Sequence, residues 1–156
     1  MSQENVEFAC GFYAVVTDLY DRTEALHLAH ETGDFGEFSP GLEELIDPEA
    51  VLRTPEGSMF PEAGTKEWHG REGLMRFMVG QTDGFKEMWI KPHEYIDAGD
   101  RVVVPLRFGG RARHTGIEVE FDVVHVLTIR ERRLSRLDIY LNKAEAVKAA
   151  GLSELR

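Results

Sequence analysis

Cysteine is almost missing from the sequence, which contains only Cys10. An internal disulfide is therefore excluded, and this fits a reducing compartment, so we expect a cytoplasmic protein. Phe8, Ala9 and Phe12 surround Cys10 on an expected apolar helix face, without a basic neighbour that would lower the thiol pKa. We predict that Cys10 is a buried packing residue and not a nucleophile.

Long hydrophobic runs are missing as well. No stretch approaches the roughly 20 apolar residues that a membrane-spanning helix needs. The first residues, MSQENVEF, lack the basic start and the apolar run of a signal peptide. We therefore expect no membrane partner.

Positive net charge is also missing, because 28 acidic residues outnumber 18 basic ones and give a net charge of −10. This balance argues against general nucleic-acid binding. Basic residues gather late in the chain, in RFGGRARH and RERRLSR. We interpret them as a solvated sheet end or hairpin, and the alternative is a rim that attracts an anionic ligand. The sequence contains no phosphate-binding loop, Rossmann glycine pattern or serine elbow, so we expect no cofactor.

Length and periodicity predict one domain over residues 1–156, with helices in its first half. Apolar residues recur every three or four positions over residues 5–31, which predicts one long helix. Shorter helices are predicted in LEELI and over residues 71–85. Residues 55–69 contain two prolines and two glycines and predict a long loop of the kind that often shapes a site.

The second half of the chain has the alternation of strands. AVLRT is a short early strand, and later strands are predicted in WIKPHEYID, RVVVPLRFGGRAR, residues 117–130 and LSRLDIYLN. Helices followed by hairpin-linked strands predict an α+β fold, with an antiparallel sheet and helices on one face.

Two local signals refine this prediction. The pair Gly109 and Gly110 lies inside a predicted strand and suits a bulge or bend. Asn142, with Glu145 three residues later, predicts a capped final helix, for which Gly151 is the C-terminal stop.

The longest predicted strand, which contains FDVVHVLTI, has two unlike faces. Its apolar face runs from Ile117 to Ile129 and is expected in the core, yet its middle position is His125. The opposite face is polar at its ends but apolar at Val124 and Val126. An apolar patch on an otherwise wet face predicts a subunit contact, so we expect a homodimer through the outer sheet face.

Four stretches together resemble the SnoaL-like branch of the nuclear transport factor 2-like superfamily: WHGREGLMRF, HEYIDAGDRVVV, GGRARHTGIEVEFDVVHVLTIR and RLDIYLNKAEAVKAAGL. The superfamily includes ketosteroid isomerases, polyketide cyclases, limonene epoxide hydrolase and scytalone dehydratase. The resemblance implies a cone-shaped α+β barrel, in which a curled antiparallel sheet wraps around N-terminal helices and encloses an apolar pocket. Since this fold serves enzymes and non-catalytic binders alike, function depends on the pocket residues.

The resemblance also implies candidate catalytic positions. The general base of the steroid isomerases falls on Thr54, in LRTPEGS, and a hydroxyl is too weak a base for that role. Their oxyanion donor falls at or beside His125, whose imidazole can donate a hydrogen bond or act as an acid or base. The residue nearest to the acid/base position of the polyketide cyclases is Asp138. Asp138 shares a strand face with Arg136 and Tyr140, and the sequence leaves open whether this face points inward. The Asp-Arg-Asp set of limonene epoxide hydrolase cannot be placed.

The expected pocket residues carry apolar or hydrogen-bonding side chains, and the two tryptophans among them flank the helix over residues 71–85 at the expected pocket mouth. They are Tyr13, Tyr20, Leu52, Thr54, Trp68, Trp89, Phe121, Val123 and Leu127. The tyrosines can hydrogen-bond the histidine or a ligand, or simply pack, and the tryptophans can stack on a flat ligand or pack.

A metal site is considered at HLAHE, where His27 and His30 share a helical face close to Glu31. Zinc requires three or four ligands in fixed geometry, and no clear further ligand is present, so we expect no metal.

Two functions remain open. The first is a non-catalytic protein that binds a small hydrophobic molecule. The alternative is an acid/base isomerase, polyketide-cyclase-like enzyme or dehydratase that acts on such a molecule. Thr54 at the base position favours binding, whereas an inward His125 keeps the enzyme under consideration.

Overall fold

The computed structural model describes residues 2–34, 39–55 and 66–152. Its helices are α1 (Ser2–Asp21), α2 (Thr23–Thr32), α3 (Ser39–Leu45), α4 (Gly70–Gly80), the 3-10 turn η1 (Gln81–Asp83) and α5 (Lys143–Ala149). Its strands are β1 (Ile46–Thr54), β2 (Lys66–His69), β3 (Phe85–Pro92), β4 (Ile96–Ala98), β5 (Arg101–Ala112), β6 (Glu118–Arg130) and β7 (Arg133–Tyr140). No described helix is both long and apolar enough to cross a membrane.

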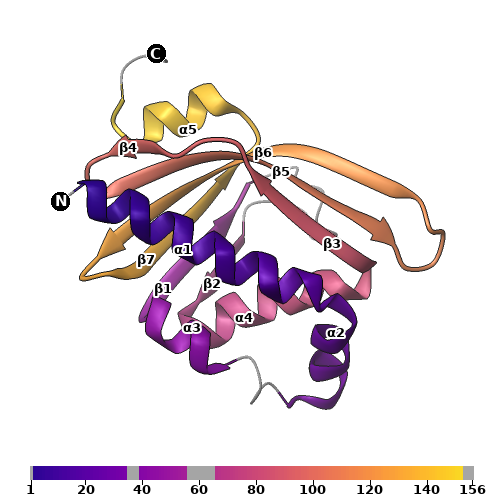
Figure 1. Cartoon of the computed structure of the whole chain (residues 1–156). Helices are drawn as coiled ribbons and strands as arrows, with labels where there is room; N and C mark the ends of the chain where they lie inside the picture. Colours follow the sequence, from indigo (N-terminus) through magenta and orange to yellow (C-terminus); the bar gives the residue numbers. More distant parts are fainter. Residues whose placement is uncertain (1, 35–38, 56–65, 153–156) are drawn as a thin grey trace.

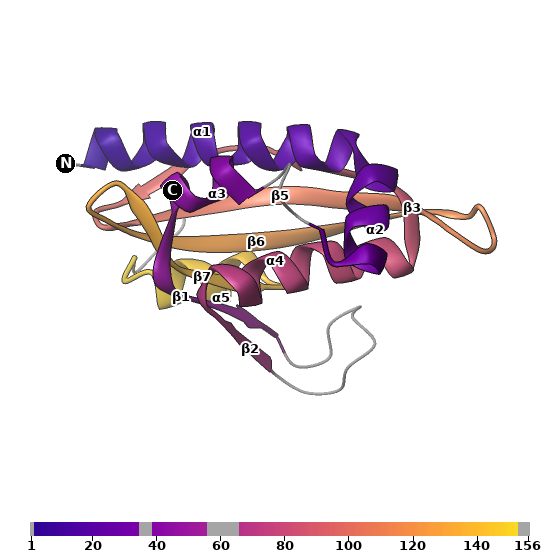
Figure 2. The ribbon, with the colours of Figure 1, turned by 90° about the horizontal axis from the view of Figure 1, so that it is seen from below.

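The strands form one curled, open sheet in the order β2-β1-β7-β6-β5-β3, and β4 pairs with β5. Helices α1, α2 and α4 lie on its concave side, and α5 lies on the opposite, outer side (Figures 1 and 2). The predicted cone-shaped α+β fold is confirmed. One pairing differs from the expected antiparallel pattern, because β1 runs parallel to β7.

The predicted first helix is divided in two. Arg22 has φ −112° and ψ 40°, which are outside the helical region, and the chain turns there from α1 into α2. Both helices bury their apolar stripe in the same core, α1 through Phe12 and Val16 and α2 through Leu26. A continuous stripe therefore predicted the buried face correctly but concealed the break.

The prediction for Cys10 is wrong, because its side chain is exposed. The buried face of α1 includes Ala9, Phe12 and Tyr13. Each residue turns about 100° around a helix of 3.6 residues per turn, so Cys10 falls just outside this face, next to the fully buried Ala9.

The outer face of the sheet carries a small second core beneath α5. Val103, Val124 and Val126 pack there against Ala146 and Val147 of the helix. The apolar patch from which the homodimer was inferred is therefore covered by the chain's own last helix. The homodimer stays a prediction, but Val124 and Val126 no longer support it.

Helix α5 starts and stops where the sequence predicts. The Asn142 side-chain oxygen accepts hydrogen bonds from the backbone N–H groups of Ala144 (2.8 Å) and Glu145 (3.2 Å). After the last turn Gly151 adopts φ +84°, a left-handed conformation that glycine allows without steric cost.

Strands β5 and β6 form a long hairpin whose tip projects beyond the helices (Figures 1 and 2). Ile117 lies at this tip and is 61% exposed. The expectation that the whole face from Ile117 to Ile129 is core is therefore wrong at its outer end, because no helix reaches that far.

Gly109 and Gly110 allow close packing, whereas the sequence predicted a bulge or bend. The β5–β6 register runs through both residues without a shift. A Cβ atom on Gly109 would overlap the Trp89 indole, and one on Gly110 would overlap the Phe85 ring. Two aromatic side chains of β3 therefore pack directly on these glycines, one on each face of the sheet.

The close packing of Trp89 on Gly109 predicts opposite effects on stability for two glycine-to-alanine substitutions. Gly109→Ala should lower the free energy of unfolding by about 1–3 kcal/mol, since its methyl group must displace the indole. Gly11→Ala is the matched control: no atom lies within 4 Å of its Cβ position in α1, and it should stabilise by about 0.5–1 kcal/mol. Urea denaturation measures both, and an unchanged midpoint for Gly109→Ala would show that the indole does not lie on Gly109.

Candidate functional site

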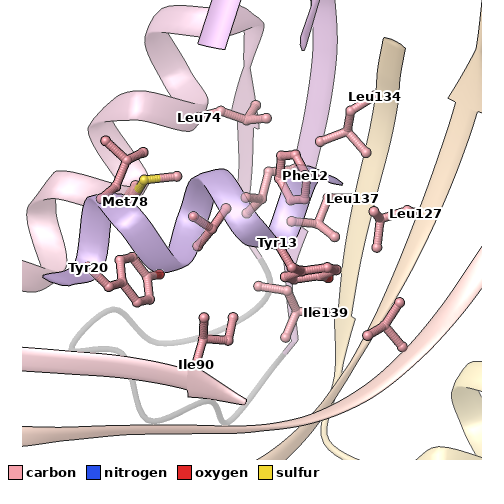
Figure 3. Packing of buried hydrophobic residues seen from close by; sticks show 14 of the residues in the cluster. Phe12, Tyr13, Tyr20, Leu74, Met78, Ile90, Leu127, Leu134, Leu137 and Ile139 are labelled. Carbon is pink, nitrogen blue, oxygen red and sulfur yellow. The ribbon is translucent and has the colours of Figure 1, made fainter. Parts of the chain in front are cut away.

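A cavity lies between α1, α4 and the concave face of the sheet (Figure 3). The space open to the centre of a water molecule is about 60 Å³. Most lining side chains are apolar, among them Phe12, Val16, Leu52, Leu74, Met78, Ile90, Phe108, Val123, Leu137 and Ile139. Four polar side chains also line it: Tyr13, Tyr20, Gln81 and His125.

Tyr13 of α1 and His125 of β6 meet across this cavity, with 2.7 Å between the phenol oxygen and Nδ1. Burial raises the pKa of Tyr13 well above its ordinary value, so the phenol keeps its proton. Burial lowers the pKa of His125 to about 3, so the imidazole is neutral at neutral pH. Tyr13 therefore donates to Nδ1, and His125 carries its own proton on Nε2.

The Nε2–H group remains available to a ligand. Among the described residues Tyr13 is the only hydrogen-bond partner of the imidazole, and the ring lines the cavity. An imidazole with a pKa of about 3 is a poor base at neutral pH but a good neutral donor. The site can therefore donate a hydrogen bond to a carbonyl or hydroxyl oxygen.

The second polar pair joins α1 to η1. The Tyr20 phenol donates to Gln81 Oε1 at 3.1 Å, and the Tyr20 ring meets Phe108 edge-on at 6.1 Å. Burial raises the pKa of Tyr20, so this group is also neutral. No described lining residue of the cavity carries a charge at neutral pH.

The structure brings five of the predicted site residues together around the cavity: Tyr13, Tyr20, Leu52, Val123 and His125. Three of them come from strands whose alternation places them inward, and the two tyrosines lie on the apolar stripe of α1. Periodicity placed these residues inward, and the family resemblance implied the pocket that they line.

Four other predicted pocket residues lie outside the cavity lining. Leu127 is fully buried in the core, and Phe121 packs at the edge of that core. Thr54 is buried at the end of β1. Trp68 of β2 packs edge-on against Phe77 of α4, with ring centroids 5.7 Å apart. These side chains surround or support the cavity without lining it.

Trp89 and Asp138 lie on the outer face, away from His125. The indole Nε1 of Trp89 donates to Glu120 at 2.8 Å. Asp138 accepts from Arg136 Nε at 2.9 and 3.2 Å. The two catalytic candidates therefore lie on opposite sides of the sheet. The facing of Asp138, which the sequence left open, is therefore outward.

Gln81 is the polar lining residue that the sequence did not reveal. It lies in η1, directly after α4, within the stretch that the sequence predicted as one helix over residues 71–85. Its contact with Tyr20 spans 61 positions, so no local pattern indicates it. Most of the predicted loop over residues 55–69 lies outside the described residues, and residues 66–69 form β2.

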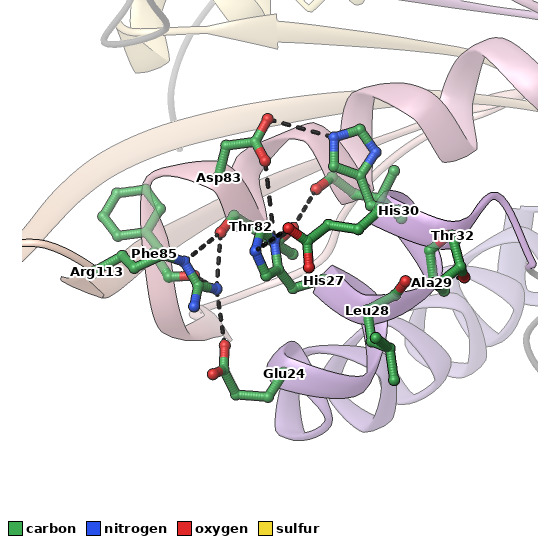
Figure 4. A network of polar contacts seen from close by, with 12 residues as sticks. Glu24, His27, Leu28, Ala29, His30, Thr32, Thr82, Asp83, Phe85 and Arg113 are labelled. Atoms are coloured by element: carbon green, nitrogen blue, oxygen red, sulfur yellow. Dashed lines mark hydrogen bonds and ion pairs between the residues drawn. The ribbon is translucent and has the colours of Figure 1, made fainter.

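His27 and His30 take part in a network that fastens α2 to η1 (Figure 4). The Thr82 hydroxyl donates to Val79 O, so it accepts from His27 Nδ1 at 3.0 Å. His30 Nε2 lies 3.3 Å from Asp83. Arg113 donates hydrogen bonds to Thr82 O at 2.9 Å and to Glu24 at 2.7 Å.

In the part of the chain that the structure describes, no group of three potential ligands is placed to hold a metal.

The neutral imidazole predicts a specific pH dependence of stability. Below pH 6.5, His125 takes up a proton in the unfolded chain but not in the folded one, so stability falls as the pH drops from 6.5 towards 3. Between pH 8 and pH 5 the wild type should lose about 2 kcal/mol more of its free energy of unfolding than His125→Phe. Urea denaturation at several pH values measures this, and His114→Gln, which changes an exposed histidine, should follow the wild type. Parallel curves for wild type and His125→Phe would contradict a neutral His125 in the folded protein.

Comparison with known proteins agrees with this architecture. An NTF2-like protein of unknown function from Burkholderia pseudomallei is 24% identical, with a TM-score of 0.56 over 83% of this chain and 95% of that one. An NTF2-like protein from Anabaena variabilis is 15% identical, with a TM-score of 0.62 over 90% of each chain. TerC, co-crystallised with polyporic acid, is 23% identical, with a TM-score of 0.55 over 81% of this chain and 93% of that one. These likenesses show the fold.

No curated protein matches the chain. The family model of the SnoaL-like domain matches residues 23–137, which are most of its length. The chain belongs to the SnoaL-like family.

Proposed function

We propose that the protein binds a compact hydrophobic molecule in the cavity and donates a hydrogen bond to one of its oxygen atoms from His125 Nε2. The observation that carries the proposal is the Tyr13–His125 pair in an otherwise apolar lining. A small set of fixed polar groups in an apolar cavity is typical of sites that orient a small molecule.

The described residues favour binding over acid/base catalysis. A general base works best when its pKa lies near the operating pH, and that of His125 is about 3. Asp138 is on the other side of the sheet and is held by Arg136. No observation on the described residues favours the isomerase, polyketide-cyclase-like or dehydratase alternative.

The lining can adapt to its ligand. Met75 and Met78 of α4 line the cavity next to Phe77, and methionine side chains rearrange at low cost. The space open to the centre of a water molecule is about 60 Å³, so a one-ring molecule fits only with small movements of the methionines. The imidazole requires that this molecule carry a hydrogen-bond acceptor.

A matched pair of probes tests the proposal. Acetophenone has a carbonyl acceptor, whereas ethylbenzene has nearly the same shape without one. The wild type should bind acetophenone about 5–10-fold more tightly, as expected for one hydrogen bond of about 1 kcal/mol or slightly more. Titration followed by NMR chemical shifts measures both dissociation constants.

Two variants make this test specific. His125→Phe fills the same space without a donor, so it should bind the two probes equally well. Asp138→Asn changes the outer face and should keep the wild-type preference. If neither probe binds, or if His125→Phe keeps the preference, the proposed function is wrong.

A further inference from the structure

The cavity lies beside a hollow on the outer surface, between the ends of β1 and β7. The last paired residues of these two parallel strands are Arg53 of β1 and Asp138 of β7. Beyond this pair, Pro55, Ile139 and Leu141 line both the cavity and the hollow. These three residues separate the two spaces where the strands diverge, so an entrance to the cavity at this point would pass between them.

Arg53 stands at the outer side of this entrance. Its side chain is exposed and lines the hollow. Its cross-strand neighbour is Asp138, but that carboxylate is engaged by Arg136 Nε at 2.9 and 3.2 Å. Arg53 consequently forms no ion pair with any residue that the structure describes.

Arg53 is the only cationic side chain among the described residues that line the hollow, where the other polar residues are Thr54, Tyr140, Asn142 and Glu145. The amide oxygen of Asn142 is occupied by the cap of α5. Glu145 of α5 also lines the hollow and brings a negative charge, which opposes an anion. A guanidinium matches a carboxylate through two parallel hydrogen bonds, so Arg53 can select this group despite Glu145.

We propose that the ligand is an amphipathic carboxylic acid, with its hydrophobic body in the cavity and its carboxylate at Arg53. This inference rests on the proposed function and adds the chemical class of the ligand. Arg53 is then a specificity-determining residue at the entrance, whereas His125 contacts the part of the ligand that lies inside.

The test compares 4-phenylbutanoate with 4-phenylbutanamide, which has the same body and no charge. The wild type should bind the acid about 3–10-fold more tightly, the effect expected of an exposed charge-assisted pair. Arg53→Gln should remove this preference and leave the affinity for the amide unchanged. Glu145→Gln is a control with the opposite expected effect. It removes the negative charge that repels the ligand carboxylate, so it should strengthen binding of the acid. Isothermal titration calorimetry measures each dissociation constant.

The outcomes separate the two proposals. If the wild type binds acid and amide equally, or if Arg53→Gln weakens both to the same extent, the carboxylate inference is overturned and the proposed function stands. If neither compound binds and acetophenone also fails to bind, the proposed function itself is overturned.

Discussion

A hydrogen bond between Tyr13 and His125 joins the first helix to the middle of the sheet, and the properties of the site depend on it. The 2.7 Å contact fixes the imidazole tautomer and gives Nδ1 its hydrogen-bond donor, while Nε2–H stays available to a ligand. Without this donor, Nδ1 would be a buried acceptor with no partner among the described residues, at a cost of about 1–3 kcal/mol. The same bond holds α1 over the concave face and so sets one wall of the cavity.

Burial gives this pair its chemical character. An apolar lining disfavours charge, and it therefore raises the pKa of Tyr13 and lowers that of His125. Both groups stay neutral, so the site offers a directed hydrogen bond and little proton transfer at neutral pH. A proton-transfer enzyme on this scaffold would need a carboxylate or a less buried imidazole facing the cavity, and Asp138 faces the other way.

Much of the fold and part of the site could be predicted from local patterns. Alternation around His125 placed the imidazole inward, and the capping box at Asn142 predicted the start of α5. Failures came where a distant partner decides the outcome. Val124 and Val126 looked exposed because α5, which covers them, is remote in sequence. Trp89 was wrongly assigned to the pocket. Its indole packs on Gly109 of the neighbouring strand, and the sequence does not show that β3 pairs with β5.

The most direct measurement of the neutral Tyr13–His125 pair is a ¹⁵N NMR spectrum of the imidazole nitrogens at pH 7, assigned by comparison with His125→Phe. A buried, neutral pair predicts a protonated Nε2 and an unprotonated, hydrogen-bonded Nδ1, unchanged down to about pH 5 because the pKa is about 3. A proton on Nδ1, or a ring that is charged at pH 5, would contradict it.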